Sequence, residues 1–73
     1  MQTTVTTDDA RLAEKIRGID ESLRKSFAAM PVDDVEVEVR RSMTEIDLDL
    51  PDETLREYAQ HVSDRADYEL VLP

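Results

Sequence analysis

Cysteine and tryptophan are absent from this 73-residue chain, which also has only one glycine, one histidine and one phenylalanine. Without cysteine there is no disulfide and no thiolate metal site, so stability must come from one small hydrophobic core or from a partner chain. A domain of this length buries only about 60% of the surface that its unfolded chain exposes. We therefore expect a single small domain, residues 1–73, of marginal stability.

Long apolar runs are missing as well. No stretch approaches the roughly 20 apolar residues that cross a bilayer as a helix. Residues 1–10, MQTTVTTDDA, lack the basic region and the apolar centre of a secretory signal. The sequence therefore predicts a cytoplasmic protein that does not contact the membrane.

Basic residues are scarce. Nine lysines and arginines accompany 18 aspartates and glutamates, which gives a net charge of −9, and the whole excess lies in residues 31–73. Because an acidic surface repels phosphate groups, we expect no direct binding of nucleic acid. Such a surface suits a protein partner with a basic surface, although solubility or adaptation to salt would explain the same composition.

Side chains that carry chemistry are equally sparse. No glycine-rich phosphate loop and no nucleophile–base signature occurs. His61 has acidic residues about one helical turn away on both sides, but a metal site needs more ligands in a fixed geometry. The carboxylates of residues 47–53 lack the glycine and the final glutamate of a calcium loop. We therefore predict no enzyme activity, no cofactor and no metal.

Two segments have helical periodicity. Residues 8–29 carry apolar side chains at spacings of three and four until Pro31 ends the element, whereas residues 1–6 read as a frayed end. A second helix is expected over residues 51–65, with Pro51 at its first position. The apolar stripes of the two helices are Leu12, Ile16, Ile19, Leu23, Phe27 and Met30, and Leu55, Tyr58, Ala59 and Val62.

Residues 32–50 carry two competing patterns. Apolar and charged residues alternate over 35–40 and again over 46–50, as in strands with one buried face. Residues 32–46 fit a helix equally well, because their apolar members also recur at spacings of three and four. A third alternating run follows near the C-terminus. The apolar members of the three runs are Val35, Val37 and Val39, then Ile46, Leu48 and Leu50, then Tyr68, Leu70 and Leu72.

These runs predict an α+β fold ordered α-β-β-α-β, in which two helices pack on one face of a small, mostly antiparallel sheet. The alternative is an all-α three-helix bundle with an extended C-terminal tail. The predicted core comprises Leu12, Ile16, Ile19, Leu23, Phe27, Val35, Val37, Val39, Ile46, Leu48, Leu50, Leu55, Tyr58, Val62 and Leu70.

In the sheet arrangement Glu36, Glu38, Asp47 and Asp49 share the face opposite the core, and we predict that this acidic patch binds a partner. The leading hypothesis is a small acidic, non-catalytic protein-binding or regulatory module that acts through a protein partner. A second hypothesis is an inhibitor that imitates nucleic acid and blocks a DNA- or RNA-binding protein. A third is a structural or assembly subunit of a homo-oligomer or virion, in which exposed strand edges pair between copies.

Overall fold

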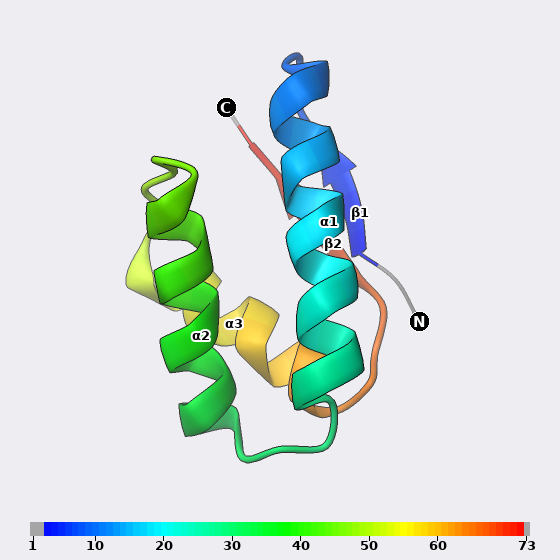
Figure 1. Cartoon of the computed structure of the whole chain (residues 1–73), viewed down its shortest axis with the longest axis vertical. Helices are drawn as coiled ribbons and strands as arrows, with labels where there is room; N and C mark the ends of the chain where they lie inside the picture. Colours follow the sequence, from blue (N-terminus) through cyan, green and yellow to red (C-terminus); the bar gives the residue numbers. More distant parts are fainter. Residues whose placement is uncertain (1–2, 73) are drawn as a thin grey trace.

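A computed structural model describes residues 3–72. Its elements, in chain order, are β1 (Thr3–Thr6), α1 (Ala10–Phe27), α2 (Val32–Glu45), α3 (Asp52–Ser63) and β2 (Tyr68–Val71). The two strands, from opposite ends of the chain, form a parallel sheet beside the helices (Figure 1). The predicted α-β-β-α-β order and its mostly antiparallel sheet are therefore wrong.

Helix α1 begins where the sequence provides a capping side chain. The Oδ1 atom of Asp9 accepts hydrogen bonds from the backbone N–H groups of Arg11 and Leu12, each at 3.1 Å. This cap satisfies two of the four N–H groups that a helix N-terminus leaves unpaired. The helix then runs for 18 residues and buries the centre of its predicted stripe.

Residues 35–40, predicted as the first strand, lie within a helix, α2. In α2 the side chains of Val35, Val39 and Met43 are fully or almost fully buried, whereas Val37 is 64% exposed. A strand would bury Val37 on the same face as Val35 and Val39, but a helix turns it to the opposite side. The segment is helical because a helix buries Met43 on the same side as Val35 and Val39. This side of α2 packs closely against α3.

Residues 46–50, predicted as the second strand, connect α2 to α3. Asp47 has a φ of 60°, and it directly follows Ile46, the C-cap residue of α2. The backbone N–H of Asp47 donates to Thr44 O at 3.0 Å, and that of Leu48 donates to Met43 O at 2.9 Å. These two bonds close a left-handed helix cap, so the alternating residues here belong to a helix end and its loop.

The N-terminal residues form a strand. Residues 1 and 2 of the expected frayed end lie outside the described residues, but Thr3–Thr6 pair in parallel with Tyr68–Val71. The side chains of Thr3 and Val5 are buried, while those of Thr4 and Thr6 are exposed. The alternative prediction of a bundle includes three helices, but its unpaired tail is β2 in the structure, so the chain is not all-α.

The core lies between the three helices and the inner face of the sheet (Figure 1). Several predicted core residues are only partly buried, namely Leu12, Ile19, Phe27, Ile46, Leu48 and Leu50. The buried core residues are Val5, Ala13, Ile16, Leu23, Val35, Val39, Met43, Leu55, Tyr58, Ala59, Val62, Leu70 and Leu72.

None of the helices described between residues 3 and 72 has both the length and the apolar character needed to cross a membrane.

Leu23→Ala should lower the free energy of unfolding by about 2–5 kcal/mol, because it removes buried methyl groups and leaves a cavity. Leu23 is 3% exposed, whereas Val37, at 64%, provides the matched control. Val37→Ala should change the same quantity by no more than about 0.5 kcal/mol. Urea denaturation followed by circular dichroism measures both, and equal effects would contradict the helical assignment of α2.

Candidate functional site

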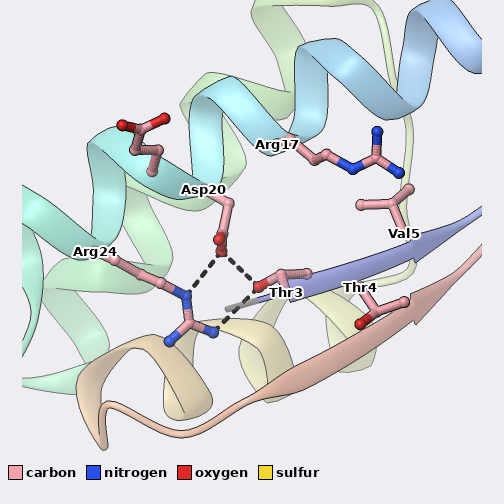
Figure 2. Close-up of a pocket in the computed structure, with 7 residues that line it drawn as sticks. Thr3, Thr4, Val5, Arg17, Asp20 and Arg24 are labelled. Atoms are coloured by element: carbon pink, nitrogen blue, oxygen red, sulfur yellow. Dashed lines mark hydrogen bonds and ion pairs between the residues drawn. The ribbon is translucent and has the colours of Figure 1, made fainter. Parts of the chain in front are cut away.

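A carboxylate lies inside the core. Asp20, on the inner side of α1, is 6% exposed. Its Oδ1 atom accepts hydrogen bonds from the hydroxyls of Thr3 and Tyr58 and, at 3.0 Å, from Nε of Arg24. Arg24 also donates through Nη2 to Thr3 Oγ1 at 3.1 Å (Figure 2). These four residues, the Asp20 network, connect β1, α1 and α3.

The network balances its own charge. The side chains of Asp20 and Arg24 are 8% and 11% exposed, so each charge has lost most of its hydration and depends on the other. Burial, reinforced by the hydrogen bond to Asp20, raises the pKa of the Tyr58 phenol far above its usual value. Tyr58 therefore stays protonated and remains a hydrogen-bond donor. The network therefore holds β1, α1 and α3 together through hydrogen bonds.

The helical spacing alone indicates that Asp20 faces inward, because it lies four residues after Ile16 and three before Leu23, both buried. The identity of its partners Thr3 and Tyr58 is not in the local pattern, since they lie 17 and 38 residues away.

A groove of about 460 Å³ opens between α1 and β1. Figure 2 shows the side chains of Asp20 and Arg24 pointing from α1 toward Thr3, while Arg17 extends toward Val5. The groove is lined by Thr3, Thr4 and Val5 of β1 and by Arg17, Asp20, Glu21 and Arg24 of α1.

Among residues 3–72, no strand pairs with the edge of β1 that borders this groove. The Leu72 N–H donates to Thr6 O at 2.8 Å, which fixes the ladder between β1 and β2. Bonding groups alternate along a parallel strand, so Thr4 and Thr6 turn their backbone N–H and C=O toward β2. By the same alternation the N–H and C=O of Val5 point away from β2, toward the open edge.

The four predicted partner-binding residues do not share a face. Glu36 is 20% exposed and accepts a hydrogen bond at 3.2 Å from Arg56. Glu38 lies on another side of α2, in a groove shared with α1. Asp47 follows the end of α2 and Asp49 lies on the connection to α3. The sheet that would align them does not exist, but whether any of them binds a partner stays a prediction.

Asp49 has a different setting from the other three. It borders a hollow of about 330 Å³ at the end of the molecule where α1 begins. The floor of this hollow is largely leucine, and its rim is acidic and hydroxylated. The lining comprises Thr7, Asp8, Asp9, Leu12, Leu48, Asp49, Leu50 and Leu72.

Within residues 3–72 no three histidine, cysteine, aspartate or glutamate side chains gather as a metal site would require. The Nδ1 atom of His61 lies 2.7 Å from Glu57 O, and the Nδ1–H donates a hydrogen bond to this carbonyl oxygen, which can only accept one. The His61 ring packs 4.8 Å from the ring of Tyr68, which in turn lies 5.5 Å from that of Tyr58. The histidine therefore joins an aromatic contact between α3 and β2.

No protein-family model matches the chain, and neither a curated protein nor a solved structure does so. The function is therefore inferred from the geometry alone.

Alkaline pH should destabilise the protein partly through Tyr58. An unfolded tyrosine loses its proton near pH 10, whereas folded Tyr58 keeps it, so above about pH 10 the folded state binds more protons than the unfolded state. The free energy of unfolding should then fall as pH rises, and the full stability should be present below pH 10. In Tyr58→Phe this fall should be shallower.

Urea denaturation at pH 8 and pH 11 tests this linkage. At pH 8, Tyr58→Phe should also be less stable by about 1.5–3 kcal/mol, because a hydrogen bond to a buried charge is lost. Burial and Glu57 raise the pKa of Tyr68 to about 12, which also lies above pH 11, so Tyr68→Phe should flatten the fall by a similar amount. An equal fall in wild type and Tyr58→Phe would contradict the prediction.

Proposed function

We propose that this chain is a small, non-catalytic cytoplasmic module that binds a protein partner by accepting an extended segment as a third strand beside β1. The unpaired edge of β1, open to a groove of about 460 Å³, carries the proposal. Strand addition at a free sheet edge is a common mode of peptide recognition, with backbone hydrogen bonds supplying affinity and side-chain pockets supplying specificity.

The small size of the sheet supports this mode. Each strand has four residues and, within the described part of the chain, one strand neighbour, which leaves one edge of each strand unpaired there. Each backbone hydrogen bond gained at such an edge contributes about 0.5–1.5 kcal/mol net. The outward N–H and C=O of Val5 would bond an added strand without disturbing the ladder to β2.

Of the two free edges, that of β1 fits the role better. By the alternation that points the backbone N–H and C=O of Val5 away from β2, the backbone N–H and C=O of Glu69 and Val71 point away from β1. Charged side chains on an edge strand hinder further pairing, and Glu69 places one there. Residues 3–6 of β1 carry no charge, and the Asp20 network fixes the strand at Thr3.

Proline substitutions distinguish the two edges. Val5→Pro removes the N–H that faces the groove but no ladder hydrogen bond, and proline is tolerated on strand edges. Glu69→Pro is the matched control, because it removes the outward N–H of β2. The probe is the blocked peptide TTVTVTT, titrated into the isotope-labelled protein and followed through backbone amide shifts.

Wild type and Glu69→Pro should both show shifts concentrated on residues 3–6 and on the Arg17–Arg24 side of α1, whereas Val5→Pro should show none. Thermal melting of each variant confirms that it is folded. Binding by Val5→Pro equal to that of wild type, or shifts confined to the carboxylates of α2 and α3, would contradict strand addition. The second pattern would favour the nucleic-acid-imitating or acidic-patch mode.

A further inference from the structure

The groove has charges on the side formed by α1. Arg17 and Glu21 are exposed, line the groove and lie one helical turn apart. Within residues 3–72 neither side chain forms an ion pair, whereas Asp20 and Arg24 are buried against each other. The two charges available to an occupant of the groove are therefore one positive and one negative.

The spacing of these charges matches that of a strand. Four residues along a helix advance about 6 Å, at 1.5 Å per residue. Two residues along a strand advance about 6.6 Å, and their side chains point to the same face. A strand added beside β1 would therefore place side chains i and i+2 opposite Arg17 and Glu21, an acid near the former and a base near the latter.

The order of the two residues follows from the chain directions. Arg17 lies at the Val5 end of the groove, and Arg24, further along α1, bonds Thr3 at the other end, so α1 runs opposite to β1 (Figure 2). An added strand antiparallel to β1 runs with α1 and passes Arg17 before Glu21. Antiparallel pairs outnumber parallel ones about two- to threefold.

We propose that the groove selects an extended segment of a protein partner in which an acidic residue is followed, two positions later, by a basic residue, paired antiparallel to β1. This inference rests on the strand addition proposed above. It names the recognised sequence pattern, acid-x-base, and the two residues that read it, Arg17 and Glu21.

A second copy of this chain does not provide that pattern in a strand, because its two acid-x-base runs, residues 9–11 and 38–40, lie at the start of α1 and within α2. Residues 3–6 carry no charge, and β2 offers Glu69 without a base two positions later. Residues 46–50, IDLDL, contain acids alone. The occupant is therefore a segment of a different protein.

Two blocked peptides of identical composition test the inference, TTEVKTT with the acid first and TTKVETT with the base first. Dissociation constants come from amide-shift titrations at low salt. Wild type should bind TTEVKTT roughly tenfold more tightly, because reversing the order turns two attractive pairs into two repulsive ones. The ratio should fall toward one in 1 M NaCl, where the Debye length is about 3 Å.

A charge-exchange variant provides the decisive control. The double substitution Arg17→Glu, Glu21→Arg keeps the net charge and changes only exposed positions, so it should fold as wild type does. Its preference should reverse, with TTKVETT now bound more tightly by a similar factor. If the peptides bound only through a general attraction to the protein, the preference between them would not reverse in this variant.

The outcomes separate this inference from the proposed function. Equal binding of both peptides at the edge of β1 overturns the acid-x-base pattern but leaves strand addition standing. Preference of wild type for TTKVETT overturns the antiparallel order in the same way. Failure of TTEVKTT, TTKVETT and TTVTVTT to bind at millimolar concentration, or binding elsewhere, overturns both proposals. A dimer of the chain held through β1, detected by solution mass, overturns the assignment of a foreign partner.

Discussion

The structure depends on the burial of one carboxylate. Asp20 has little contact with water, and an ionised group in that position is tolerated only when hydrogen bonds and an opposite charge replace its hydration. The replacements come from Thr3, Arg24 and Tyr58, so β1, α1 and α3 meet at a single oxygen atom. Loss of any one partner would leave the charge under-compensated. Strand β1 is thereby fixed at Thr3 against the helices, which places its outer edge beside α1.

Local pattern was sufficient for α1 and α3 and insufficient between them. The stripes of those helices have one period and clear ends, whereas residues 32–46 fit periods of both 2 and 3.6. The choice depended on the surface of α3, against which Val35, Val39 and Met43 pack. The sequence pattern did not predict β1 either, because its single apolar residue, Val5, gives no alternation of apolar and polar residues. It becomes a strand by pairing with residues 68–71, a contact that no local rule encodes.

The candidate site shows the same division. Arg17, Glu21 and Arg24 are recognisable as one flank of a helix, and a helical projection from Ile16 and Leu23 turns Asp20 inward. The element opposite that flank is β1, which pairs with β2, and this pairing of distant residues is not visible in the local sequence pattern. The acidic patch of Glu36, Glu38, Asp47 and Asp49 was predicted from strands, in which alternate residues share a face. The structure has α2 and its left-handed cap in place of these strands, so the four residues do not share a face.

The acidity of the molecule and the neutrality of its groove act on different length scales. At physiological salt the net charge of −9 is felt within about 8 Å of the surface, where it repels strongly acidic segments before they dock. In the groove itself Arg17 offsets Glu21, and Arg24 offsets Asp20. A segment that carried acids alone would gain one contact at Arg17, but Glu21 and the net negative charge of the protein would repel it. A segment with both signs avoids that opposition, because its base contacts Glu21 and cancels its own net charge. The field of the whole protein thus disfavours acidic segments, and the two charges on α1 favour a segment that carries both signs.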